Sequence, residues 1–249
     1  MSVRIDPKLI DDPQVWAWLK GRLNFGRNVR SWVPGEFGEY ARILHPAQLW
    51  GDEGEGVTFV SWQEISRWSG KPLTATSSFF RIALRSDGTV WGPPQGSSRP
   101  LEGDLVSPFI DRLTQLLETE TSAPERVWFL VWSGYGSILA RGAFDLSKPL
   151  RSSGRSYVLR RGAIDSLVHE EPGPHISESP SFWWPDDRAW FVSTDIDTLS
   201  TYVGGGRSLV SRLLADDLLE AFPAELDDRF DGEATPEEAR AVLTGGNRP

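Results

Sequence analysis

The sequence predicts an α+β protein in which helices pack against a mixed, largely antiparallel sheet. Segments with strand character and segments with helix character follow one another in irregular order, not in the regular alternation of βαβ units. Ser86-Asp87-Gly88-Thr89 forms a hairpin-type turn between two strand candidates. A chain of 249 residues can also bury a large core without disulfides or structural metals.

The first part of the chain is expected to contain two helices followed by two strands. Asp12-Pro13 supplies a cap and a first-turn proline for a helix whose apolar residues recur four apart. Residues 34–45 are expected to form a second helix, because their apolar side chains lie at helical spacing and Pro46 would stop it. Short strands are expected over residues 57–60 and 77–84, where β-branched and aromatic residues gather.

The later elements follow from capping signals and apolar runs. Ser61 and Glu64 have the spacing of a capping box, which predicts a helix start. Ser107-Pro108 begins a helix reaching about residue 120, and residues 126–132 are apolar on both faces, as in a central strand. The other expected elements are strands over 156–160 and 188–194, a short helix near 164–169, a helix over 207–221 and a last short helix from Thr235.

The charge of the chain is concentrated near its C-terminus. The net charge is −9, and the segment from Asp216 onward carries ten acidic and three basic residues, or −7. We expect residues 1–228 to form one α+β unit, with a candidate division into two subdomains at the Gly- and Pro-rich segment 93–103. Residues 229–249 are expected to be an acidic, weakly attached tail, which could fold back on basic residues of the body.

Composition excludes several classes of protein. The absence of cysteine excludes disulfides, thiol catalysis and cysteine-ligated metals, and it fits the cytoplasm. The longest apolar run, residues 127–132, is far shorter than a membrane span. A pI of about 4.9 disfavours nucleic-acid binding. Trp18 and its neighbouring aromatics are therefore interpreted as core side chains that arginine stems cover.

Two stretches of the sequence carry a resemblance. Residues 32–46 read WVPGEFGEYARILHP, and residues 182–190 read FWWPDDRAW, continuing through Asp195-Ile196-Asp197 to Tyr202-Val203-Gly204-Gly205. Together they resemble a family of uncharacterised actinobacterial proteins. The resemblance implies an origin, which fits the excess of arginine over lysine, and it implies no activity.

One candidate site combines a carboxylate pair with a glycine-rich segment. Asp195 and Asp197 have the Asp-x-Asp form and could hold Mg²⁺ or Mn²⁺, or could simply form a turn. Gly204, Gly205 and Arg207 lie at a strand-to-helix connection that could receive a phosphate, or could be a flexible link. The alternative hypothesis for function is therefore a metal-dependent enzyme or binder acting on a phosphorylated or nucleotide-type ligand.

The other candidate site is the aromatic segment that includes Trp183 and Trp184. Three large aromatics precede Pro185, and at least one of them is expected to face solvent or cover a neighbouring element. Tryptophan is enriched in binding hot spots, although a structural plug packed on Trp190 would also explain the cluster. Together with Arg188, this segment predicts a non-enzymatic, cytoplasmic binding or regulatory protein that needs no cofactor and whose partner is a protein.

The three histidines, His45, His169 and His175, lack the spacing of a zinc protease, and structural or surface roles are expected for them.

Overall fold

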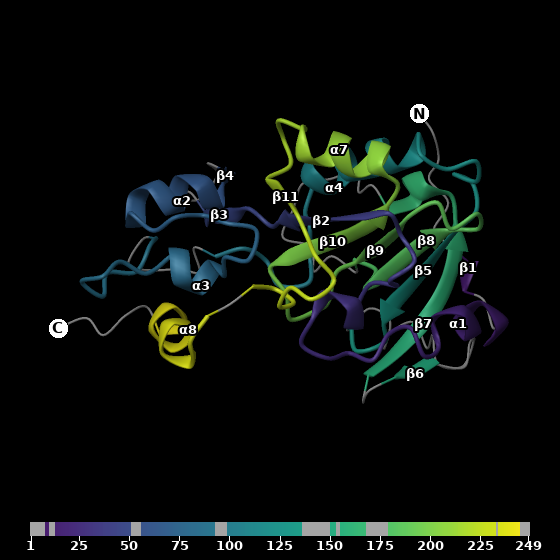
Figure 1. Ribbon diagram of the computed structural model, residues 1–249, viewed down its shortest axis with the longest axis horizontal. Coiled ribbons are helices and arrows are strands. Elements are labelled where there is room, and N and C mark those ends of the chain that lie inside the picture. Colours follow the sequence, from purple (N-terminus) through teal and green to yellow (C-terminus); the bar gives the residue numbers. More distant parts are fainter. Residues whose placement is uncertain are drawn as a thin grey trace.

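The protein is built on a large antiparallel sheet with helices on both faces (Figure 1). The computed structural model describes residues 8–9, 13–50, 56–92, 99–135, 150–152, 155–167, 179–232 and 234–244. Nine strands run in the order β1-β7-β5-β8-β9-β10-β2-β11, with β6 also paired to β7, and the predicted α+β class is confirmed. The strands are β1 Lys8–Leu9, β2 Glu39–Leu44, β5 Val127–Trp132, β6 Leu150–Ser152, β7 Arg155–Gly162, β8 Phe182–Pro185, β9 Phe191–Ser193, β10 Ser200–Gly205 and β11 Ala221–Pro223.

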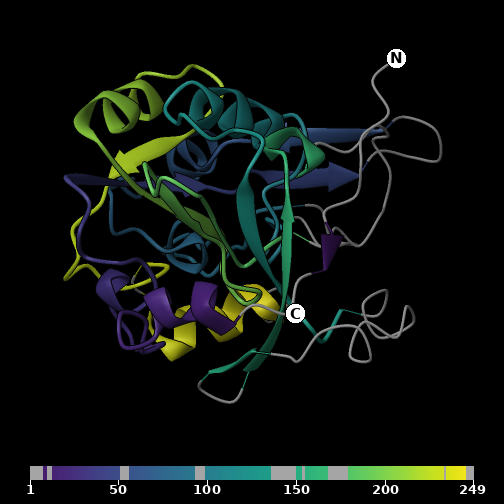
Figure 2. The same cartoon turned by 90° about the vertical axis from the view of Figure 1, so that its right-hand side faces the viewer.

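Helices cover the sheet on its two sides, and each side has its own apolar cluster. Helices α4 (Phe109–Glu118) and α7 (Arg207–Leu214) lie on one face, and α1 (Pro13–Leu19) lies on the other (Figure 2). Successive residues of a strand point to opposite faces. The central strands β5 and β8 are therefore apolar at almost every position. The short helices η1 Val29–Ser31 and η2 Ile164–Leu167 complete these layers.

A smaller group of elements, the small lobe, lies beside the part of the sheet formed by β2 and its edge strand β11 (Figure 1). Its helix α2 begins after Ser61, which forms the predicted capping box with Glu64. Its core is made by buried residues of α2 and α3, including Trp62 and Phe79. The elements of the small lobe are β3 Ala47–Trp50, β4 Val57–Val60, α2 Trp62–Ser69, α3 Phe79–Ile82 and the C-terminal helix α8 Pro236–Leu243.

Two expected elements have the wrong type. Residues 34–45 do not form a helix, because Glu39–Leu44 is strand β2, paired on one side with β10 and on the other with β11. A strand buried on both faces and a buried helix give the same apolar run, so periodicity could not separate them. Residues 77–84 do not form a strand either. Phe79 and Ile82 are buried one helical turn apart in α3.

Two expected elements have the right type and different limits. The strand expected over 188–194 begins at Phe191, because the preceding residues form a turn in which Arg188 has a φ of 54°. The helix expected over 207–221 ends at Leu214, and residues 221–223 form the edge strand β11. Of the segment 93–103, residues 93–98 lie outside the described part, and Pro100 forms an isolated bridge with Ala47.

The C-terminal segment runs from β11 to the small lobe. Arg30, from the basic segment near the N-terminus, forms an ion pair with Asp227. The ring of Phe230 stacks between Trp32 and Tyr202, at centroid distances of 4.6 and 4.8 Å. Beyond this anchor, α8 contacts α3 and has no buried residue. Among the described residues, no helix is long and apolar enough to cross a membrane.

Candidate functional site

Asp195 and Asp197 follow strand β9, and a single arginine engages both carboxylates. One guanidinium nitrogen of Arg155 contacts Asp195, and Nη2 of the same group lies 2.5 Å from Asp197 Oδ2. The Asp195 side chain also accepts a hydrogen bond from the Asp197 N–H at 3.1 Å, and Thr198 N–H donates to the Asp195 carbonyl. This geometry is that of the turn interpretation. The described residues contain no group of three or more side chains able to hold a metal ion.

The glycine-rich segment joins strand β10 to helix α7, as the sequence predicted, but it does not form a loop. Gly204 and Gly205 are buried residues of strand β10. A Cβ on Gly205 would lie 2.7 Å from Leu209, so the absence of a side chain lets α7 approach the sheet. Arg207, the first residue of α7, is exposed and donates from Nε to Glu39 at 2.8 Å.

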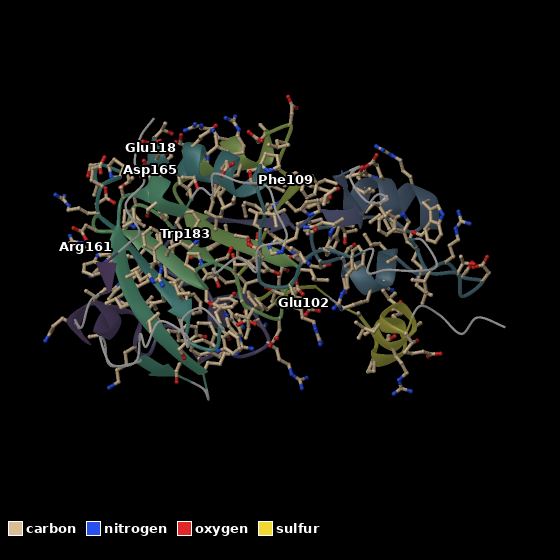
Figure 3. The ribbon with its side chains drawn as sticks, turned by 180° about the vertical axis from the view of Figure 1, so that it is seen from behind. Glu102, Phe109, Glu118, Arg161, Asp165 and Trp183 are labelled. Carbon is tan, nitrogen blue, oxygen red and sulfur yellow. The ribbon has the colours of Figure 1, made fainter. Side chains whose placement is uncertain are left out.

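Trp183 and Trp184 do not form the exposed aromatic surface that the binding hypothesis placed there. Trp183 is 1% exposed and Trp184 is 2% exposed. Strand alternation points Trp183 toward α4 and Trp184 toward α1, and because both faces of the sheet are covered, consecutive aromatics can all be buried. The ring of Trp183 packs edge-on against Trp190 at 5.2 Å, as the plug interpretation predicts. Figure 3 shows Trp183 inside the body and Arg161 at its edge.

Trp184 nevertheless supports a surface feature, which we call the arginine–tryptophan ridge: Arg188, Trp18, Trp184, Trp128 and Arg161. Trp184, Trp128 and Arg161 are direct neighbours across β8, β5 and β7, and therefore share one face of the sheet. The Arg161 guanidinium lies 4.5 Å from the centre of the Trp128 ring. On the other side, Trp18 of α1 packs on Trp184 at 5.5 Å, and the Arg188 guanidinium lies 4.6 Å above Trp18.

Arg188 owes its position to the turn between β8 and β9. The Arg188 N–H donates to the Pro185 carbonyl at 2.9 Å, and Arg188 itself has a left-handed backbone with a φ of 54°. Hairpin turns of this kind usually place glycine at such a position. The side chain is exposed, and among the described residues no carboxylate pairs with it.

Asp186 is shared by several donors at the end of the ridge. It accepts from Arg126 at 3.0 Å, from Arg161 at 2.6 Å and from the indole N–H of Trp128 at 2.5 Å. The adjacent Asp187 is engaged elsewhere. Burial tends to raise its pKa, but hydrogen bonds from Ser122 and its neighbours outweigh burial and lower that pKa. Arg126 and Arg161 thus share one carboxylate, and Arg188 pairs with none in the described part of the chain.

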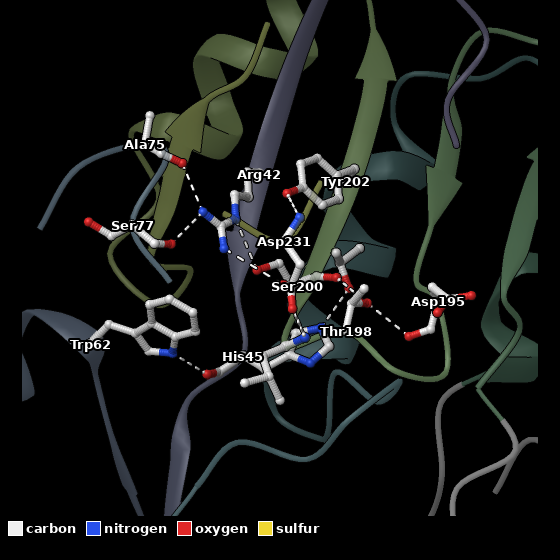
Figure 4. A network of polar contacts seen from close by, with 12 residues as sticks. Arg42, His45, Trp62, Ala75, Ser77, Asp195, Thr198, Ser200, Tyr202 and Asp231 are labelled. Atoms are coloured by element: carbon white, nitrogen blue, oxygen red, sulfur yellow. Dashed lines mark hydrogen bonds and ion pairs between the residues drawn. The ribbon is translucent and has the colours of Figure 1, made fainter. Parts of the chain in front are cut away.

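A second polar cluster joins the large sheet to the small lobe (Figure 4). Arg42 of β2 is buried and donates to Ser200 Oγ at 3.0 Å, and to the Ala75 and Ser77 carbonyls of the small lobe at 2.9 and 2.8 Å. Its Nη2 lies 3.7 Å from the carboxylate of Asp231, in the C-terminal segment. Glu220 adds a further link, because its carboxylate accepts the first two N–H groups of α2 at 2.6 and 2.7 Å.

His45 lies in the same junction and is fixed in its neutral form. Its Nδ1 lies 3.0 Å from the Leu101 carbonyl, which can only accept, so Nδ1 carries the proton. Its Nε2 then accepts from Thr201 Oγ1 at 2.9 Å. Burial lowers the pKa of His45 from 6.5 to about 4. This confirms a structural role for His45, whereas His169 and His175 lie outside the described residues.

Comparisons with other proteins add no assignment. No protein-family model, no curated protein and no solved structure matches the chain. The actinobacterial resemblance therefore stays an expectation.

Sequence reasoning selected Arg188 and Trp184 and missed Trp128 and Arg161. The residues that complete the ridge come from strands distant in sequence, and only the register of β5 with β7 and β8 brings them together.

Proposed function

We propose that the chain is a non-enzymatic binding or regulatory protein that contacts a protein partner through the arginine–tryptophan ridge. Arg188 is the observation that carries the proposal. It stands at a backbone position that favours glycine, it is exposed, and within the described part of the chain it has no carboxylate partner. A non-glycine residue in the left-handed region costs about 1 kcal/mol. A contact with a partner would account for an arginine at this position.

The chemistry of the ridge suits a contact surface. Arginine and tryptophan are both enriched among residues that dominate binding energy, and Trp128 is the partly exposed tryptophan of the ridge, whereas Trp18 and Trp184 are buried. Each exposed guanidinium is stacked on an indole, which reduces its freedom before a partner arrives. The β8–β9 turn is held by backbone hydrogen bonds from Asp186 to Arg126 and from Arg188 to Pro185. A partner would therefore meet a surface that is already in place.

The metal-dependent alternative has less support in the geometry. An ion at Asp195 and Asp197 would have to displace Arg155, which already forms ion pairs with both carboxylates. We also propose a cytoplasmic location, because a chain without cysteine has no disulfide that a reducing compartment would break.

The proposal can be tested by retention of partners on immobilised protein. We would compare the wild type, a ridge variant (Arg161→Gln with Arg188→Gly) and a control variant, Arg67→Gln, from the exposed side of α2 in the small lobe. Proteins retained from a native lysate of the source cells would be identified by mass spectrometry. We expect a protein that the wild type and Arg67→Gln retain and the ridge variant loses. Identical sets of retained proteins for all three would overturn the proposal.

A further inference from the structure

We infer that the ridge binds an acidic segment of its protein partner, whose carboxylates pair with Arg161 and Arg188. This inference rests on the proposed function and names the class of partner. It follows from the local charge at the ridge, from the contacts that the Arg161 and Arg188 guanidinium groups already make, and from the charge of the rest of the chain.

The local charge at the ridge is positive on a negative protein. Arg126 and Arg161 share the carboxylate of Asp186, and Arg188 has no carboxylate partner in the described part of the chain. The neighbouring carboxylate, Asp187, accepts hydrogen bonds from Thr121 and Ser122, and no ion pair joins it to Arg161 or Arg188 among the described residues. Glu36 also lies here, because its carboxylate accepts from the Trp18 indole N–H at 3.0 Å and pairs with Arg22 at 2.7 Å. Four arginines, Arg22, Arg126, Arg161 and Arg188, therefore face the carboxylates of Asp186 and Glu36, while the whole chain has a net charge of −9.

The two outer arginines are suited to bind carboxylates. Their guanidinium carbons lie 4.5 and 4.6 Å from the ring centres of Trp128 and Trp18. Nη2 of Arg161 also pairs with Asp186 at 2.6 Å, whereas no carboxylate pairs with Arg188 among the described residues. A guanidinium edge presents two parallel N–H groups that match the two oxygens of a carboxylate. Between the two arginines lie the indoles of Trp128, Trp184 and Trp18, of which Trp128 is partly exposed and the other two are buried.

The acidic C-terminal segment of the chain itself does not supply the anion. Several of its carboxylates are engaged elsewhere, among them Asp216 with Arg112 and Asp227 with Arg30, and none of those described pairs with Arg161 or Arg188. A long polyanion such as nucleic acid is disfavoured too, because two excess positive charges cannot offset repulsion from the remainder of an acidic protein. A short acidic peptide segment contacts the ridge alone and avoids that repulsion.

The test is a binding titration followed by fluorescence anisotropy. The probes are a fluorescein-labelled glutamate-rich peptide, a lysine-rich peptide of the same length and an oligothymidine of the same length. We expect the glutamate peptide to bind best, with an affinity that falls as salt rises. Arg188→Gly and Arg161→Gln should each weaken it about tenfold, since each variant removes one charged contact. The control Arg67→Gln should change it less than about twofold.

Three results would overturn the inference: equal binding of both peptides, tighter binding of oligothymidine, or full affinity for the glutamate peptide in both ridge variants. These outcomes are separate from those of the retention experiment. If a protein partner is lost by the ridge variant while the glutamate peptide does not bind, the acidic class is wrong and the contact surface stands. If the ridge variant loses no partner, the proposed function itself fails.

Discussion

Acidification should destabilise this protein through His45. The folded state lowers the pKa of this imidazole from 6.5 to about 4, because the ring is buried and its Nδ1–H already donates to Leu101. Above pH 6.5 the ring is neutral in both the folded and the unfolded chain, and the stabilisation is fully present. As the pH falls toward 4, the His45 imidazole becomes protonated in the unfolded chain while it stays mostly neutral in the folded protein. The free energy of unfolding then drops by about 2 kcal/mol at pH 5 and about 3 kcal/mol at pH 4.

Asp231 acts in the opposite direction over part of the same range. Burial raises its pKa from 3.8 to about 6, although nearby Arg42 favours the charged form. The folded protein therefore binds this proton more readily, and the contribution of Asp231 to stability grows as the pH falls from about 6 to 4. The pH profile of the wild type is the sum of both effects, so the contribution of His45 has to be isolated by a variant.

His45→Gln is the matched variant, because a glutamine amide can donate to the Leu101 carbonyl and accept from Thr201. Urea unfolding of both proteins at pH 7 and pH 5 gives a double difference in which Asp231 cancels. We expect the wild type to lose about 2 kcal/mol more than the variant on acidification. Equal losses would refute the reasoning. If the variant does not fold, an NMR titration of the wild type supplies the answer, and a His45 pKa near 6.5 would refute it.

Three further predictions concern packing, capping and metals. Trp183→Ala should lower the free energy of unfolding by about 3–5 kcal/mol in urea melts, since the side chain is 1% exposed. A loss below about 1 kcal/mol would contradict the burial of this side chain. Ser61→Ala should lower the free energy of global unfolding by about 1 kcal/mol. Thr235→Ala removes the same type of capping box from α8, which has no buried residue, and should therefore reduce hydrogen-exchange protection in α8 alone. Mg²⁺ or Mn²⁺ should leave the melting temperature unchanged, and a shift that Asp195→Asn abolishes would contradict the engagement of that carboxylate by Arg155.

Local signals in the sequence predicted those elements whose ends are set by their own residues. The Ser61–Glu64 capping box and the Thr235 cap both appear in the structure, because side chain and backbone within one turn determine them. The central strand at residues 127–132 was predicted from apolar side chains on both faces. Such signals need no knowledge of distant parts of the chain.

Elements whose type depends on distant partners were predicted incorrectly. The run that ends at Leu44 has apolar residues at helical spacing, and it becomes a strand because β10 and β11 pair with its two edges. The same limit applied to the candidate site. The sequence pointed to Arg188 and to a tryptophan cluster beside it. A contact surface was expected around Trp183 and Trp184, which are both buried, since the helices on both faces of β8 could not be foreseen. Trp128 and Arg161 join the ridge through strand register alone.

The most direct test of the proposed contact surface compares Arg188→Gly with the wild type in two measurements, the free energy of unfolding and the retention of the protein partner. Glycine relieves the left-handed backbone and removes the contact with Trp18. These effects nearly offset each other, so stability should stay unchanged or rise by up to about 1 kcal/mol, while partner retention falls. A variant that retains its partner fully, or that loses more than about 1 kcal/mol of stability, would show that Arg188 serves the fold and not a contact.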